Sequence, residues 1–211
     1  MATLSSRAEQ HGATHRAALL PRTTRGLLIA ATLLGGILAG GNVNRNLVHM
    51  PAWRQVGALA WATFSRHADL GLNGMIVYPL EGIGGAVLTV AAAIAYHFDR
   101  SAPRSAAIAI YAAAGLVVGG MLATTQAAPI MMSVRHLGDD PVALQQAFDG
   151  FEFWGRVRGI FQVAAFVANL WSLVAVYRAT APVRARDRAC PHCQRALCRY
   201  AGGGLLCRLH S

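Results

Sequence analysis

Four long apolar stretches constrain what this chain can fold into more than any other feature of its sequence. They cover residues 26–43, 75–98, 105–134 and 157–177. At 1.5 Å per residue, even the shortest of them reaches roughly 27 Å as a helix, close to the thickness of the hydrocarbon core of a bilayer. The sequence therefore predicts an all-α, four-transmembrane-helix bundle over residues 26–178.

Composition points to the same class of protein. Apolar residues make up 55% of the chain and charged residues only 13%, which is about half the charged share of an average soluble domain. The first stretch has basic residues before it and small residues at its end, so it also resembles the apolar region of a signal peptide. Its apolar run is longer than the roughly 7–15 residues of such regions, which favours a retained membrane helix.

The remaining segments are expected to lie outside the four spans. Residues 1–25 are basic, without an apolar period, and are expected to be a disordered tail. The segment PAWRQVGALAWATFSRHADL begins with Pro51 and places Trp53 and Phe64 on one apolar stripe. This pattern predicts an amphipathic helix lying at the membrane interface between the first two spans. Residues 135–156 are predicted to form an acidic, aromatic loop, and 179–211 a basic tail that carries the cysteines.

The arginines predict the orientation of the chain, and all 19 basic residues are arginine. With four spans, the two tails and the turn at 98–105 share one side, which holds 13 arginines, whereas the other side holds six. The positive-inside rule then places both termini in the cytoplasm of a multi-pass inner (plasma) membrane protein. This distribution accounts for the net charge of +10 with the lipid bilayer as partner and without nucleic acid. The oligomeric state stays open.

Glu81 is the only carboxylate inside an apolar stretch. A charge in hydrocarbon costs roughly 3 kcal/mol or more, which makes this residue a candidate for function. Counted from the predicted outer boundary, Glu81, Gln126 and Gln162 lie about 9, 12 and 8 Å deep. We therefore expect these three side chains, each from a different span, to converge in the outer half of the bundle.

Two interpretations of this polar layer remain open. In the first, it is a pocket open to the outer side, where Glu81 accepts a proton with His67 or Arg158 as its partner, and where Arg135 and Trp154 contribute to binding. In the second, Glu81 pairs with one of the two arginines and only sets the register of the helices. The glutamines then form interhelical hydrogen bonds worth about 0.6 kcal/mol each. No two of His49, His67 and His136 have the i, i+4 spacing of a helical metal site, so no cofactor is expected in the membrane domain.

The C-terminal tail carries a possible metal motif of its own. Cys190-x2-Cys193 is followed after thirteen residues by Cys207-x2-His210, a spacing typical of zinc knuckles, and three cysteines with one histidine are an ordinary zinc ligand set. The predicted cytoplasmic side is reducing, which favours free thiolates over disulfides. A structural zinc site and a flexible cationic tail with free thiols both fit the sequence.

Two short segments carry a resemblance to a known family. They are TTQAAPIMMSVRHL, and FEFWGRVRGIFQVAAFVANLWSLV with its Trp154-x-x-x-Arg158 motif. Together with His67 and Pro79, they resemble the anthrone-oxygenase-like domain of unknown function, a group of small four-helix membrane proteins. The resemblance implies an oxygenase acting on an apolar aromatic molecule dissolved in the bilayer. Glu81 or a nearby histidine would remove a proton, and the resulting carbanion would react with oxygen. The competing hypothesis is a membrane protein without catalysis, serving as a scaffold or a small-molecule binder.

Overall fold

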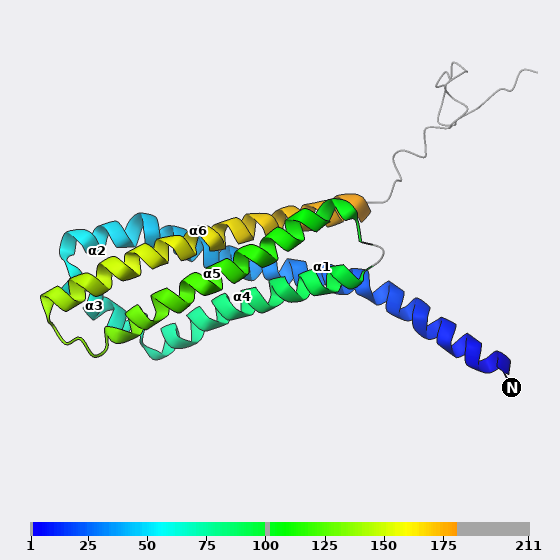
Figure 1. Cartoon of the computed structure of the whole chain (residues 1–211), viewed down its shortest axis with the longest axis horizontal. Helices are drawn as coiled ribbons and strands as arrows, with labels where there is room; N and C mark the ends of the chain where they lie inside the picture. The colour runs from blue at the N-terminus through cyan, green and yellow to red at the C-terminus, as the bar shows by residue number, and fades with distance from the viewer. Residues whose placement is uncertain (1, 100–101, 181–211) are drawn as a thin grey trace, which may run out of the picture. The chain divides into compact units, whose positions relative to one another are not determined.

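The protein is a bundle of α-helices, seen in a computed structural model that describes residues 2–99 and 102–180, with side chains described for 22–99 and 102–179. Every regular element in these ranges is helical, and four helices are long and apolar enough to cross a membrane, as predicted. The elements are α1 (Ala2–Asn44), η1 (Arg45–His49), α2 (Met50–Val56), α3 (Ala58–His67), α4 (Leu72–Phe98), η2 (Arg104–Ala106), α5 (Ala107–Ser133) and α6 (Pro141–Thr180) (Figure 1).

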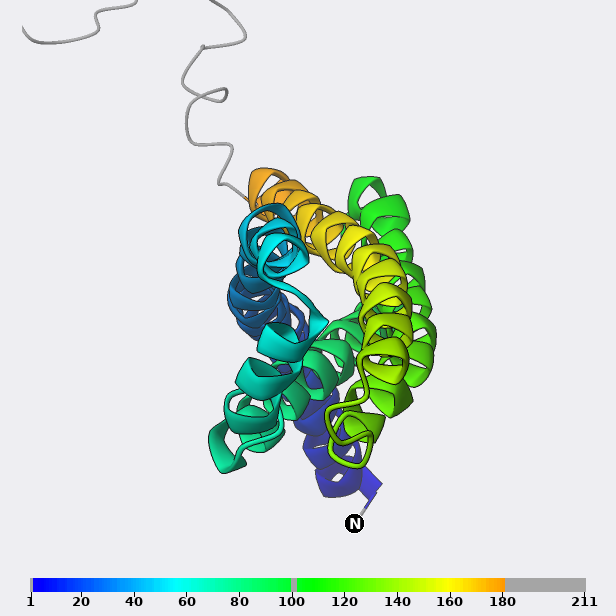
Figure 2. The ribbon, with the colours of Figure 1, turned by 90° about the vertical axis from the view of Figure 1, so that its left-hand side faces the viewer.

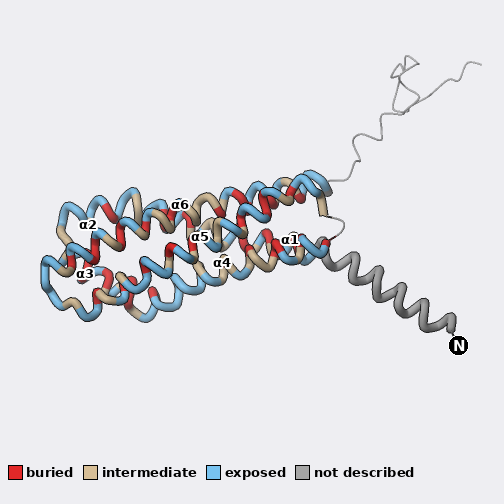
Figure 3. The backbone as a smooth tube through the Cα atoms, in the orientation of Figure 1, coloured by how far each residue is buried: buried red, intermediate tan, exposed pale blue. Residues whose placement is uncertain are grey.

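The four long helices lie around a common centre in the order α1, α4, α5, α6 (Figure 2). Helix α4 packs between α1 and α5. Helix α6 closes the ring, because the ring of Phe166 meets α1 at Gly36 and the ring of Phe161 meets α5 at Gly119. Buried positions follow the inward faces of the helices (Figure 3). The spans at 75–98 and 105–134 were predicted almost to the residue.

The sequence contains two small-xxx-small patterns, Gly36-x-x-x-Gly40 in α1 and Gly115-x-x-x-Gly119 in α5, which let helices approach closely in lipid. Aromatic side chains of α6 pack against one glycine of each. A Cβ added at Gly119 would lie 2.6 Å from the Phe161 ring, and one at Gly36 would lie 3.1 Å from the Phe166 ring. A Cβ at Gly40 or Gly115 would meet nothing within 4 Å. One glycine of each pattern therefore receives a phenylalanine ring, which is how α6 approaches both neighbours.

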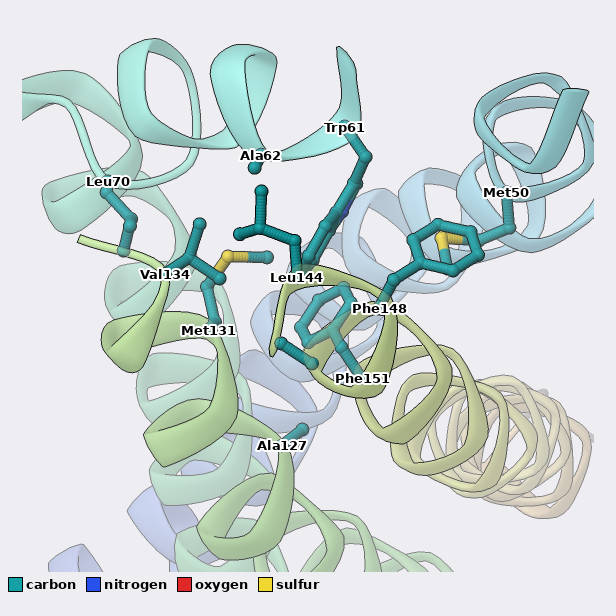
Figure 4. Packing of buried hydrophobic residues seen from close by; sticks show 11 residues of the cluster. Met50, Trp61, Ala62, Leu70, Ala127, Met131, Val134, Leu144, Phe148 and Phe151 are labelled. Carbon is teal, nitrogen blue, oxygen red and sulfur yellow. The ribbon is translucent and has the colours of Figure 1, made fainter. Parts of the chain in front are cut away.

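Two hydrophobic clusters hold the bundle together at its two ends. The cluster at the end capped by α3, called the α3 end below, contains the aromatic side chains Trp61, Phe148 and Phe151 (Figure 4). The Trp61 ring is fully buried and lies 5.3 Å from Phe148 in an edge-to-face arrangement, a favoured geometry for aromatic pairs. The cluster at the opposite end is built mostly from alanines around Tyr96, whose hydroxyl donates to the Pro103 carbonyl at 2.7 Å.

The segment between the first two spans differs from the single amphipathic helix that was predicted. It is divided at Gly57, which has a φ of +98° that only glycine adopts readily. The first part, α2, continues α1 through the π-helical turn η1, so the first span reaches Val56 instead of residue 43. Helix α3 buries Trp61, Ala62 and Ser65, whereas Phe64 of the predicted apolar stripe is exposed, so the face packed against the bundle is not the predicted one.

Helix α6 begins far earlier than the predicted start at residue 157. Asp140 acts as the N-cap, since its Oδ1 accepts hydrogen bonds from the backbone amides of Val142 at 2.9 Å and Ala143 at 3.4 Å. Pro141 follows at the first helical position, where proline is favourable. Most of the expected loop at 135–156 is therefore helix. Its aromatic residues at 148 and 151 face the cluster at the α3 end.

The N-terminal segment also differs from the expected disordered tail, because α1 begins at Ala2. The segment lacks an apolar period but is rich in alanine, the residue with the highest helix propensity. Extending a helix that already exists avoids the cost of nucleation. The absence of an amphipathic pattern was therefore weak evidence against a helix.

Candidate functional site

A narrow pocket, partly open to its surroundings, lies where α1, α4, α5 and α6 meet, with about 30 Å³ of space for the centre of a water-sized molecule. All four helices contribute a small residue or a polar side chain to its wall, and four of the lining residues are glycines: Gly35, Gly82, Gly85 and Gly120. A Cβ added at the first three would meet nothing within 4 Å. At these glycines the wall consists of backbone where most helices would present side chains, which leaves a slot between the four long helices.

Three polar side chains project into this apolar slot: Thr89, Gln162 and Asn169. The Nδ2 of Asn169 donates to the hydroxyl of Thr89 at 3.1 Å, and that hydroxyl donates to the Gly85 carbonyl at 2.8 Å. The Oδ1 of Asn169 and the Oε1 of Gln162 are buried without a hydrogen-bond partner. Each such buried acceptor costs about 1–3 kcal/mol. The slot therefore offers two unused acceptors to a hydrogen-bond donor.

A second polar group lies toward the α3 end and centres on Asp69, which is only 5% exposed. One of its oxygens forms an ion pair with Arg45, and the other accepts a hydrogen bond from the Tyr78 hydroxyl at 3.0 Å. The Arg45 guanidinium also lies 5.2 Å from the Phe151 ring and 5.8 Å from the Trp53 ring. This arginine is thus held by a carboxylate and by aromatic faces.

Glu152, only 6% exposed, is the other buried carboxylate of this region. Its Oε1 accepts from Arg156 at 2.7 Å, and its Oε2 pairs with Arg54. The side chains of both arginines remain more than 60% exposed. Glu152 therefore joins α2 to α6 at a position where its partners still reach the surrounding medium.

Arg158 is the cation that these carboxylates leave unpaired. Within the described part of the chain its guanidinium forms no hydrogen bond or ion pair, and its Nε is buried without a partner. It lies 6.0 Å from the Phe151 ring. Together with Arg45, Asn42 and Glu152, it borders a narrow void between α1 and α6.

The predicted convergence of Glu81, Gln126 and Gln162 is not found. Only Gln162 lines the slot. Gln126 is exposed, and Glu81 is half-buried, precedes the lining residue Gly82, and forms no hydrogen bond or ion pair with any described residue. The prediction matched depths but ignored rotation about the helix axis. The buried face of α5 passes through Ala123 and its neighbours at 120, 127 and 131, and residue 126 lies off that face.

The remaining predicted site residues lie around the α3 end, away from the slot. His67 is exposed at the last turn of α3, and the exposed Arg135 donates to the Leu70 carbonyl. Trp154 is half-buried and packs against the aromatic cluster, 5.2 Å from Phe153. Neither Arg135 nor Arg158 forms an ion pair with Glu81 in the described ranges. Their roles in binding or catalysis stay predictions.

Sequence reasoning overlooked Asn169 and Asp69. Asn169 follows Gln162 by seven residues, which places both on one face of a helix, and this spacing was visible in the sequence. Asp69 lies outside the apolar stretches, so hydropathy gave no sign that tertiary packing would bury it.

The zinc motif Cys190, Cys193, Cys207 and His210 lies outside the described residues, and zinc binding there stays a prediction. Among the described residues, no group of three or more histidine, cysteine, aspartate or glutamate side chains is arranged to hold a metal. Comparison of the chain with protein-family models, curated proteins and solved structures found no match. Fold and site define a multi-pass membrane protein with a mostly apolar slot inside its bundle, into which three polar side chains project.

Proposed function

We propose that this protein binds a small, mostly apolar molecule in the central slot. The observation that carries the proposal is the pair of buried, unpaired oxygens on Gln162 and Asn169 in a wall that is otherwise apolar. A ligand that donates a hydrogen bond, such as a hydroxyl compound, would satisfy an acceptor whose isolation costs about 1–3 kcal/mol. A mostly apolar site with a few placed polar groups is the usual composition of a small-molecule pocket.

The glycines support a binding role over a purely structural one. Glycine in a helix costs about 1 kcal/mol relative to alanine, and alanine at Gly35, Gly82 or Gly85 would meet no neighbouring atom within 4 Å. Helix packing alone therefore does not require glycine at these three positions. Their effect is to keep the slot open between the helices.

An anthrone-type oxygenase is the second candidate, favoured by the half-buried carboxylate of Glu81 beside the lining residue Gly82. In this mechanism Glu81 accepts a proton from an activated C–H group of a phenolic ligand in the slot, and the resulting carbanion adds molecular oxygen. The hydroperoxide so formed loses water and leaves a carbonyl group on the ligand. The slot wall contains no titratable side chain of its own, so binding is the better supported function. Glu81→Gln should leave binding intact and abolish turnover if the enzyme reading holds.

The binding proposal is tested by filling the slot. Gly85→Leu places a side chain in open space within the wall, whereas Gly115→Leu makes the same change at an exposed position of α5. We expect purified Gly85→Leu protein to lose binding of a fluorescent neutral probe, 6-(hydroxymethyl)-2-naphthol, and Gly115→Leu protein to keep it. Equal binding by both variants, or no binding by the unmodified protein, would refute the proposal.

We further propose the plasma membrane as the location, with both termini in the cytoplasm. The 13 arginines on the side of the termini against six on the other side support this orientation. All four cysteines lie in the C-terminal tail, so an impermeant thiol reagent reports on that tail alone. We expect labelling only after cells are opened, and ready labelling of intact cells would reverse the orientation.

A further inference from the structure

The central slot and the void beside Arg158 lie along one seam between α1 and α6. On α6, Gln162 lines the slot and Arg158 borders the void, one turn or about 6 Å apart along the helix axis. On α1, Leu38 lines the slot and Asn42 borders the void, again four residues apart. A molecule in the slot therefore lies about one helical turn from an arginine.

The charges around this arginine do not balance. Two buried carboxylates, those of Asp69 and Glu152, lie in a region with four arginines: Arg45, Arg54, Arg156 and Arg158. Both oxygens of Asp69 are occupied, by Arg45 and the Tyr78 hydroxyl. Both oxygens of Glu152 are occupied as well, by Arg54 and Arg156. Among the described residues, Asp69 and Glu152 therefore have no oxygen left for Arg158, and a charge within a membrane span is costly unless it is paired.

We propose that the ligand of the slot is an acid, and that Arg158 binds its carboxylate. This inference rests on the proposed binding function and specifies its ligand. The apolar body would occupy the slot with a hydroxyl donating to the amide oxygen of Gln162, while the carboxylate accepts hydrogen bonds from the guanidinium of Arg158. A flat body suits walls that present glycine backbone at Gly82 and Gly85.

The shape of the guanidinium favours one kind of anionic group. The void has no room for a free water molecule in this structure, so the unbranched side chain of Arg158 must shift as the acid arrives. A planar carboxylate matches the fork of an arginine with two parallel hydrogen bonds.

A matched pair of probes tests the inference on full-length protein in neutral detergent. The acid is 6-hydroxy-2-naphthoate, and its neutral counterpart is 6-(hydroxymethyl)-2-naphthol. We expect the unmodified protein to bind the acid at least about tenfold more tightly, as charge-assisted hydrogen bonds allow. Arg158→Gln should abolish this preference and leave the affinity for the neutral probe unchanged.

Arg156→Gln is the matched control, because it removes the same charge from the same helix but from an exposed side chain that pairs with Glu152. It should keep the tenfold preference. If Arg158→Gln does not fold, the preference of the unmodified protein decides, and Arg158→Lys, which retains the charge, should keep part of it.

The outcomes separate the two proposals. Equal binding of both probes by the unmodified protein, lost in Gly85→Leu, would overturn the acid inference and leave the proposed function standing. Failure of both probes to bind would overturn both. Binding of phosphatidylglycerol in place of the naphthoate, with the same dependence on Arg158, would overturn the carboxylate assignment, since it identifies a lipid phosphodiester as the anion.

Discussion

The carboxylates at the α3 end and the amide oxygens of the central slot are both buried, but they differ in pairing. Asp69 and Glu152 use all four of their oxygens in ion pairs or hydrogen bonds. Gln162 and Asn169 each keep one buried oxygen without a partner. Paired polar groups such as the first two connect helices, whereas unpaired ones lower stability unless a ligand satisfies them.

The difference in pairing indicates two roles within one bundle, connection of helices at the α3 end and provision of space for a ligand in the slot. The α3 end ties α1, α2, α4 and α6 together through charges and a large aromatic cluster. The slot keeps space and unused acceptors among glycines. Substitutions of the paired carboxylates at the α3 end should therefore lower the free energy of unfolding, whereas removal of an unpaired acceptor in the slot should raise it. The following four measurements test that expectation.

The largest effect is expected for Asp69→Asn. The substitution leaves Arg45 in the interior without its counter-charge, and breaking a buried pair costs about 3 kcal/mol. The free energy of unfolding in detergent, measured by denaturant titration, gives the value. Asp139→Asn is the control, because its pair with Arg66 is exposed and should contribute less than about 1 kcal/mol. Equal losses in the two variants would show that the buried pair of Asp69 with Arg45 contributes no more stability than the exposed pair of Asp139 with Arg66.

A smaller loss is expected for Glu152→Gln. Its partners Arg54 and Arg156 are largely exposed, so both can turn to solvent once the carboxylate is neutral, and we expect a loss of about 1 kcal/mol. The same titration measures it. A loss as large as that of Asp69→Asn would mean that the exposed arginines are held as firmly as Arg45.

An increase in stability is expected for Gln162→Met. This change keeps the side-chain length and removes an unpaired buried acceptor, so the free energy of unfolding should rise by about 1 kcal/mol. Affinity for the neutral naphthol probe should fall at the same time. A fall in stability would instead indicate that Gln162 is satisfied in the ligand-free protein, and would remove the main support for the slot as a binding site.

The smallest effect is expected for Glu81→Gln. Its half-buried carboxylate forms no ion pair with the described residues, so no partner is lost and the destabilisation should stay below about 0.5 kcal/mol. The thermal midpoint in detergent measures this. A large drop would favour the structural interpretation of Glu81 over both functional ones.

Much of the architecture followed from the sequence. The approximate positions of α4 and α5 followed from the hydropathy of residues 75–98 and 105–134, and the inward position of Gln162 was expected from its depth. The early start of α6 was also readable, because Asp140 and Pro141 form a helix-start signal. It was missed because the acidic and aromatic residues that follow were interpreted as a loop.

Gln126 illustrates what could not be predicted from the sequence, namely which face of a helix turns inward. Helix α5 is apolar on nearly all sides, so no periodic pattern indicated which face turns inward, and depth was mistaken for proximity. Asp69 shows the converse, since nothing in its local sequence predicts burial, yet packing places Arg45 and Tyr78 around it.

By itself, the sequence determined the class of protein, the number of spans and the approximate ends of the two central ones, because these depend on hydropathy summed along the chain and on the length needed to cross a bilayer. The tertiary structure alone decided which polar groups meet, which carboxylates are paired, and that Arg158 forms no ion pair with any described residue. Those properties depend on the rotation and neighbours of each helix, which are settled by side-chain packing between segments far apart in the chain.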